Sequence, residues 1–265
     1  MTDLLALLPP DYPLILRDGE RAVLADQALE GIVAAEAYQK PEPTHCAVPV
    51  ADLTDEGGQR LDQLIYGEVF DLLHRVEGRG WGRARRDGVI GWVQLEQLKP
   101  GIPLATRRVK GLKSPLPFNA LVLDQTSGID EAALAPVGQF DSDLVAVAEA
   151  FLGCPHVLGG RTPHGTDCSG LVQQALYACG HYGPRRTKAQ ADLGQAVDKS
   201  ELARNDLALW LNPDIAWTGH SALMVDAVTV IHSTGYHGKV VVEPLAEVEA
   251  RMLAQGYQSA LFRRL

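Results

Sequence analysis

The segment from Thr166 to Gly180 constrains the fold of this chain most, because an apolar-periodic run begins directly at a cysteine. It reads T-D-C-S-G-L-V-Q-Q-A-L-Y-A-C-G, and its apolar residues recur at helical spacing: Leu171, Val172, Ala175, Leu176 and Cys179. This spacing predicts an amphipathic helix with one face packed against a core. Cys168 then lies in the first turn of that helix.

The first turn of a helix changes the chemistry of a thiol. Its backbone N–H groups lack acceptors within the helix, and the positive end of the helix dipole favours a negative charge. We therefore expect the pKa of Cys168 to lie below the usual value of about 8.5, and the same N–H groups to suit an oxyanion. A cysteine in an apolar helix is most often a plain core residue, so Cys168 alone leaves both interpretations open.

A nucleophilic thiol needs a base, and two histidines follow in short apolar runs that are typical of strands. His220 lies in G-H-S-A-L-M-V and His232 in V-I-H-S. Because strands hold side chains rigidly, we expect His220 to accept the thiol proton and His232 to fix its tautomer. The alternative for each is a structural histidine with satisfied hydrogen bonds.

The cysteines argue against a metal centre. The chain has four, Cys46, Cys154, Cys168 and Cys179, without the C-x-x-C spacing of a zinc site. We expect free thiols in a reducing compartment, and neither a metal nor an organic cofactor.

The pattern of turns and apolar runs divides the chain into four parts. Residues 1–40 form an N-terminal extension, in which Ala25 to Ala37 is compatible with one helix. Residues 41–100 alternate as short strands with tight turns at Gly57-Gly58 and Asp87-Gly88. Residues 101–137 form either a linker or a reduced second barrel. Residues 138–265 form the second domain, which opens with the helical pattern D-S-D-L-V-A-V-A-E-A-F-L-G.

The strand-rich part resembles the bacterial SH3 domain, a small β-barrel. The resemblance rests on the Y-G-E step at Tyr66 to Glu68, a lone Trp81 after a glycine, and D-G-V-I-G-W-V before Leu98. Such barrels need glycine where a strand bends and an aromatic side chain to fill the taper.

The second domain resembles the NlpC/P60 cysteine peptidases. The motifs follow in order: G-G-R-T-P-H-G-T-D-C-S-G-L-V-Q, P-R-R-T-K-A-Q, N-D-L-A-L-W, G-H-S-A-L-M-V-D and V-I-H-S. The resemblance implies an α+β papain-like catalytic domain, preceded by a small all-β SH3-like barrel. It also implies an enzyme that cuts bacterial cell-wall peptides.

The same resemblance implies roles for individual residues. Cys168 matches the nucleophile, His220 the base and His232 the third polar group. Five further residues match positions that bind substrate or line the cleft in relatives: Asp167, Ser169, Arg186, Thr187 and Gln190. Simpler roles exist for three of them, with Asp167 as a helix cap, Ser169 as a first-turn residue and Arg186 as a surface charge.

The chain departs from the family pattern beside the cleft. Relatives usually carry P-Y-x-W-G-G where this chain has P-H-V-L-G-G, so His156 and Leu158 replace two aromatic residues. The resemblance further implies that the barrel closes one end of the cleft, where a carboxylate would bind a free substrate amino group; Glu68 is the candidate.

Charge and hydropathy exclude two classes of partner. The net charge of −9 argues against nucleic acid, which binds proteins with an excess of Lys and Arg. No run approaches the roughly 18 to 20 apolar residues that span a bilayer. The beginning, M-T-D-L-L-A-L-L-P-P, has an acid at Asp3 and no basic region, unlike a signal peptide, so we expect a cytoplasmic protein.

These observations together predict a cysteine endopeptidase of peptidoglycan recycling. Its substrates are short murein peptides with a free N-terminal L-Ala, cut between γ-D-glutamate and the diamino acid. Two alternatives remain: a module that binds wall peptide without cutting it, and an amidase or acyl transferase that uses the same thiol.

Overall fold

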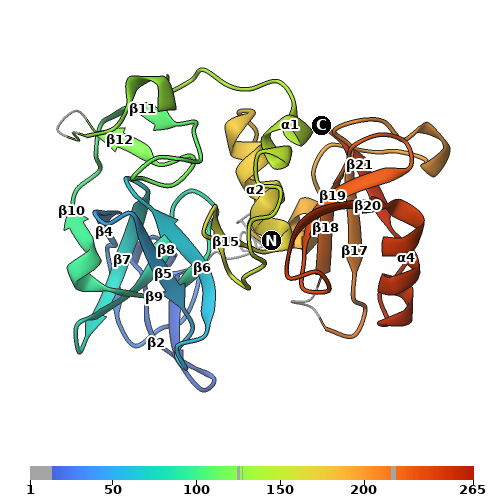
Figure 1. Ribbon diagram of the computed structural model, residues 1–265. Coiled ribbons are helices and arrows are strands. Elements are labelled where there is room, and N and C mark those ends of the chain that lie inside the picture. Colours follow the sequence, from blue (N-terminus) through green and yellow to red (C-terminus); the bar gives the residue numbers. More distant parts are fainter. Residues whose placement is uncertain (1–13, 124–125, 127, 216–218) are drawn as a thin grey trace. The chain divides into compact units, whose positions relative to one another are not determined.

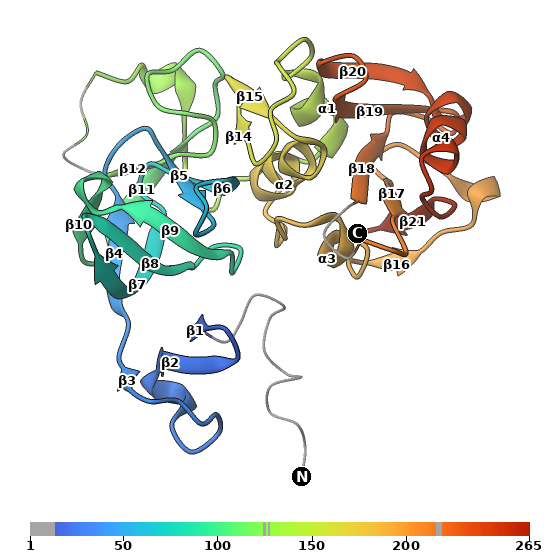
Figure 2. The same ribbon diagram turned by 90° about the horizontal axis from the view of Figure 1, so that it is seen from below.

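The computed structural model describes residues 14–123, 126, 128–215 and 219–265, and the chain divides into two compact units. The first unit takes residues 1–109 and 115–131, and the second takes residues 110–114 and 132–265. Each unit is described here by itself (Figures 1 and 2). In the described part of the chain, no helix is both long and apolar enough to cross a membrane.

The first unit begins with a three-stranded sheet in the order β1-β2-β3, whose strands are Ile15–Asp18, Arg21–Asp26 and Tyr38–Gln39. The helix expected over residues 25–37 is wrong. β2 continues through Ala25 to Asp26, and the Asp26 side chain accepts a hydrogen bond from the Ala28 N–H at 2.9 Å, which starts only a short 3-10 turn over Gln27–Leu29. The chain then returns so that Ala25 pairs in parallel with Tyr38, and strand pairing replaces the helix.

A seven-stranded sheet follows in the order β10-β4-β7-β8-β9-β5-β6. Its strands are β4 Glu42–Cys46, β5 Val50–Thr54, β6 Arg60–Ile65, β7 Val69–Val76, β8 Arg79–Ala84, β9 Ile90–Gln94 and β10 Leu98–Pro100. Apolar side chains from these strands, among them Leu53, Leu64, Phe70 and Val93, form one buried core. A Cβ atom at Gly82 would lie 2.1 Å from the Asp71 carbonyl oxygen, so the close approach of β7 and β8 requires a glycine there.

Short strands occupy the segment between residues 101 and 137. In the first unit, β11 (Ala105–Val109) and β12 (Leu121–Leu123) pair antiparallel, with Arg108 opposite Leu121. In the second unit, β13 covers Leu134–Pro136.

The second unit is built on a six-stranded sheet in the order β16-β21-β17-β18-β19-β20. The strands are β16 Gln195–Ala196, β17 Leu207–Leu211, β18 Gly219–Met224, β19 Thr229–Thr234, β20 Lys239–Pro244 and β21 Leu261–Arg264. Two further strands, β14 (Arg161–Thr162) and β15 (Gly165–Thr166), form a small hairpin before the cysteine helix.

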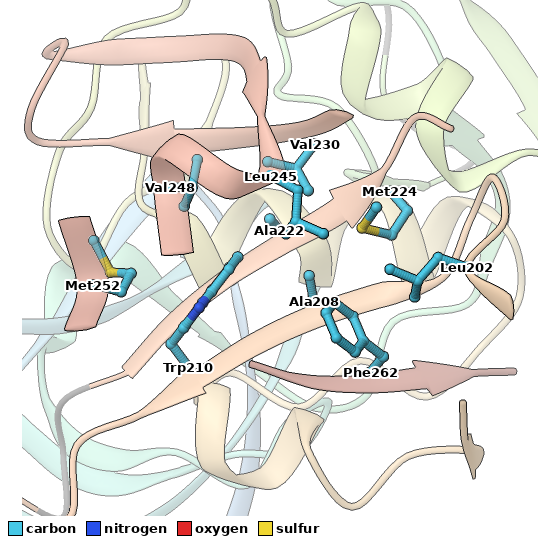
Figure 3. Close-up of a cluster of buried hydrophobic side chains, with 10 residues drawn as sticks. All are labelled: Leu202, Ala208, Trp210, Ala222, Met224, Val230, Leu245, Val248, Met252 and Phe262. Atoms are coloured by element: carbon cyan, nitrogen blue, oxygen red, sulfur yellow. The ribbon is translucent and has the colours of Figure 1, made fainter. Parts of the chain in front are cut away.

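Helices lie on both sides of this sheet. They are α1 Leu144–Glu149, α2 Cys168–Ala178, α3 Thr187–Gln190 and α4 Leu245–Ala254. In both views, α2 and α4 flank the central strands from opposite sides (Figures 1 and 2). Leu245, Val248 and Met252 of α4 pack onto Trp210 and neighbouring apolar side chains of the sheet (Figure 3).

Candidate active site

Cys168 is the first residue of α2, as the sequence predicts, and Asp167 is its N-cap. The Asp167 Oδ1 accepts a hydrogen bond from the Gly170 N–H at 2.7 Å, and Oδ2 accepts one from the Gly159 N–H at 2.8 Å. One carboxylate thus fixes the helix start and the preceding loop together. The position of the thiol is set by this cap.

Arg185 neutralises the buried Asp167. The guanidinium lies 2% exposed, donates to both carboxylate oxygens at 2.9 and 2.7 Å, and donates to the Ser169 hydroxyl at 2.9 Å. Although burial alone would raise the pKa of Asp167, the charge and hydrogen bonds of Arg185 hold it below its usual value. The sequence analysis selected the adjacent Arg186 and missed Arg185.

Two further predicted cleft residues, Gln190 and Thr187, make side-chain hydrogen bonds near the start of α2. Gln190 donates to the carbonyl oxygens of Ser169 and Pro184, both at 2.9 Å, and the Thr187 and Ser221 hydroxyls lie 2.8 Å apart. These contacts tie α2 and α3 to β18 within the second unit. Their predicted part in substrate binding stays a prediction, as does that of Arg186.

The thiol of Cys168 faces the beginning of β18. Its Sγ lies 3.8 Å from the carbonyl oxygen of Gly219, the residue before His220. Burial and the charge of Asp167 raise the pKa of Cys168 to about 11, although backbone N–H groups of Ser221 and Ser169 act in the opposite direction. The expected lowering of this pKa is therefore wrong, because removal of water from the sulfur outweighs the helix terminus.

His220 and His232 lie on strands, as predicted; these strands, β18 and β19, are neighbours, and the two side chains meet. In the antiparallel register Leu223 pairs with Ile231, which places the two histidines diagonally on one face of the β18–β19 ladder. His220 Nε2 lies 2.6 Å from His232 Nδ1, and the rings meet edge to face with centroids 4.9 Å apart. Burial lowers the pKa of His220 well below its usual value, and the charge of a protonated His232 would lower it further.

The hydrogen-bonded series continues to a residue that the sequence analysis missed. His232 Nε2 lies 2.6 Å from Oε2 of Glu243 on β20, and Arg251 of α4 donates to the same oxygen at 2.8 Å. Burial alone would raise the pKa of Glu243, but hydrogen bonds from His237, Arg251 and His232 lower it to about 2. Burial lowers the pKa of His232 to about 4. At neutral pH, Glu243 is therefore ionised and both histidines are neutral.

Protonation of the two rings follows from the ionised carboxylate, which only accepts hydrogen bonds. His232 must donate its Nε2–H to Glu243, so its Nδ1 accepts the Nε2–H of His220. The Nδ1 of His220 then carries a lone pair and can take up a proton. A neutral thiol needs a proton acceptor of this kind in order to act as a nucleophile.

His156, which replaces the usual aromatic residue, is built into the same region. The Ser233 hydroxyl donates to the Thr166 carbonyl oxygen at 2.6 Å, so it accepts the Nδ1–H of His156 at 2.9 Å. Burial lowers the pKa of His156, and Asp167 partly opposes this. Leu158, by contrast, is 73% exposed.

Glu68 has a defined place inside the barrel of the first unit. Its carboxylate is 2% exposed, accepts from the Ile65 N–H at 3.0 Å and pairs with Arg86 at 2.8 Å. These contacts hold a turn of the barrel. Its role toward a substrate amino group stays a prediction.

The four cysteines are free, as expected. In residues 14–123, 126, 128–215 and 219–265, no group of three His, Cys, Asp or Glu side chains is arranged to hold a metal ion.

Comparison with protein families confirms both resemblances. Residues 153–256 match the NlpC/P60 family, and residues 54–98 match the bacterial dipeptidyl-peptidase Sh3 domain. The chain thus contains an NlpC/P60 domain after an SH3 domain.

Two curated relatives are informative. Gamma-DL-glutamyl hydrolase of Bacillus subtilis (strain 168) is 33% identical over 109 residues, which cover 40% of this chain and 26% of the relative. Gamma-D-glutamyl-L-lysine dipeptidyl-peptidase of Bacillus cereus is 31% identical over 104 residues, or 39% of this chain and 31% of the relative. The matches thus span about a third or less of the length of these relatives.

A solved structure supports the fold. The chain superposes on an NlpC/P60 family protein from Bacillus cereus with a TM-score of 0.65 and 16% identity, covering 84% of this chain and 99% of the other. This confirms the predicted order of folds, an α+β papain-like domain after a β-rich SH3 domain.

Proposed function

Because the second unit carries an NlpC/P60 domain, we propose that this protein is a cysteine endopeptidase that hydrolyses the γ-D-glutamyl–diamino acid bond of short murein peptides. The single observation that carries this proposal is the hydrogen-bonded series from His220 through His232 to Glu243, which begins one residue after Gly219, whose carbonyl oxygen lies 3.8 Å from the Cys168 thiol. Two relatives named for γ-glutamyl hydrolysis support the choice of bond.

In the proposed reaction, Sγ of Cys168 attacks the carbonyl carbon of the γ-glutamyl amide while the thiol proton moves to Nδ1 of His220. Backbone N–H groups at the start of α2 bind the oxyanion. When the C–N bond breaks, His220 protonates the leaving amine and a thioester remains on Cys168. Water then attacks the thioester and gives a proton to His220. The C–S bond breaks, the peptide acid is released, and His220 returns the proton to Sγ of Cys168.

Burial raises the pKa of the thiol and lowers that of His220, and both shifts favour the neutral pair over a thiolate–imidazolium pair in the free protein. Proton transfer therefore accompanies the attack on the carbonyl carbon, as in general-base catalysis.

The free N-terminal L-Ala, the role in peptidoglycan recycling and the cytoplasmic location are part of this proposal. The match to the SH3 domain of bacterial dipeptidyl-peptidases supports the requirement for a free N-terminal L-Ala, because a dipeptidyl-peptidase acts near a free N-terminus. Cell fractionation tests the location.

Mass spectrometry of peptide products tests the activity. L-Ala-γ-D-Glu-L-Lys and the meso-diaminopimelate analogue are incubated with wild-type protein and with Cys168→Ala, each with and without an N-acetyl group. We expect L-Ala-D-Glu from wild type only, and only from the free amines. Cleavage of acetylated peptides would remove the free-amine requirement, and no cleavage at all would refute the endopeptidase.

A further inference from the structure

We propose that Glu243 and Arg251 are positioning residues of this active site: Glu243, held by Arg251, orients His232 and through it the base His220. The inference rests on the proposed function and extends its machinery beyond the three predicted residues to a third strand and a further helix.

A series of hydrogen bonds connects side chains from four elements of the second unit. His220 lies on β18, His232 on β19, Glu243 on β20 and Arg251 on α4. In the β19–β20 ladder Val230 pairs with Glu243 and His232 pairs with Val241, so Glu243 stands diagonal to His232 on the same face. Glu243 therefore stands in the same diagonal relation to His232 as His232 does to His220.

Glu243 is held from three sides. Its Oε2 accepts from His232 and from Arg251, and its Oε1 lies 3.0 Å from His237 Nε2. The residue is 7% exposed. Because both oxygens are occupied, the carboxylate cannot rotate away from His232, and the His232 ring is kept in the tautomer that leaves Nδ1 as an acceptor.

The charge of Glu243 also serves the reaction. When His220 takes the thiol proton, an imidazolium forms on a side chain that is only 8% exposed. A carboxylate two hydrogen bonds away stabilises that charge, whereas a buried imidazolium without it would be unfavourable. Arg251 keeps the resting carboxylate ionised and limits its attraction for the proton, so His232 is not converted to an imidazolium at rest.

A matched control exists in the same sheet. Asp206 is 1% exposed and pairs with Arg264 through two hydrogen bonds of 2.7 Å, yet it contacts neither histidine. Asp206→Asn therefore weakens a pair between a buried carboxylate and a half-exposed arginine of the same unit without touching the catalytic series.

The first test measures thiol reactivity, which needs no peptide substrate. Wild type, Glu243→Ala, Glu243→Gln and Asp206→Asn are alkylated with iodoacetamide at pH 7, and peptide-resolved mass spectrometry follows Cys168 apart from the other three cysteines. We expect the rate at Cys168 to fall about 10- to 100-fold in Glu243→Ala, as for other residues that orient a functional ligand. Glu243→Gln keeps a hydrogen-bond acceptor for His232 but loses the charge, so its alkylation rate should lie between those of wild type and Glu243→Ala. The rate of Asp206→Asn should stay within about twofold of wild type.

The second test reads the tautomer itself. Imidazole ¹⁵N chemical shifts of wild type should show His232 protonated at Nε2 and His220 protonated at Nε2. Glu243→Gln should retain the His232 tautomer, and Glu243→Ala should yield a mixture. A Glu243→Ala protein with unchanged shifts and unchanged Cys168 alkylation would overturn the inference, as would equal losses in Asp206→Asn.

The outcome is separable from that of the proposed function. If wild type cuts no murein peptide but its Cys168 alkylation depends on Glu243, the positioning role stands and the substrate proposal fails. If peptide is cut equally fast by wild type and Glu243→Ala, the endopeptidase stands and the positioning role fails.

Discussion

Arg185→Ala is the change that most severely tests the account of the helix start. It removes the guanidinium that gives both oxygens of Asp167 a charged partner and leaves a carboxylate that is 8% exposed. Loss of one partner from a buried ion pair costs about 3–5 kcal/mol, because the remaining charge stays desolvated. At about 2–4 °C per kcal/mol, the melting temperature of the second unit should fall by roughly 6–20 °C.

The control is an exposed pair of the same residue types. Arg75 and Glu42 are 46% and 54% exposed, and such pairs contribute about 0–1 kcal/mol. Arg75→Ala should therefore leave the unfolding free energy nearly unchanged. Urea unfolding is followed by hydrogen exchange with mass spectrometry, which reports each unit separately. A loss below about 1 kcal/mol for Arg185→Ala, equal to that of the control, would refute the reasoning.

Two further predictions concern the same region. A Cβ atom at Gly170 would lie 2.3 Å from the Gly160 carbonyl oxygen. Gly170→Ala should therefore destabilise the second unit by about 1–3 kcal/mol and slow the alkylation of Cys168. A variant with the wild-type stability and alkylation rate would contradict this close packing. The pKa of Asp167 is lowered and that of Glu243 is about 2. Both carboxylates are therefore ionised and contribute their full stabilisation above about pH 4.5, the usual pKa of a glutamate carboxyl. That stabilisation is lost as pH falls from about 4.5 toward 2. In the double variant Asp167→Asn/Glu243→Gln, the melting temperature should therefore fall less steeply with decreasing pH in this range. An unchanged slope would contradict the assignment.

Local patterns in the sequence predicted the reactive elements well. The helix begins at Cys168 with Asp167 as its cap, and both histidines lie on strands. These features depend on residues within one turn or one strand, where cap chemistry and alternation act directly.

Features that depend on tertiary contacts were missed. Glu243 enters the site only through the register of β19 with β20, and a lone Glu in an alternating strand carries no local signal of this. Arg185 and Arg186 are adjacent, and only the packing of the loop before α3 decides which one is buried against Asp167. The thiol pKa was mispredicted for the same reason, because desolvation depends on what covers the sulfur.

In the proposed reaction, Cys168 forms a covalent acyl intermediate with the γ-glutamyl group. The most direct measurement is rapid acid quench of the protein with L-Ala-γ-D-Glu-meso-diaminopimelate, followed by intact-protein and peptide mass spectrometry. The account predicts a thioester of L-Ala-D-Glu on Cys168 in wild type, absent in Cys168→Ala, which also releases no product. Release of L-Ala-D-Glu by Cys168→Ala at the wild-type rate would contradict the account.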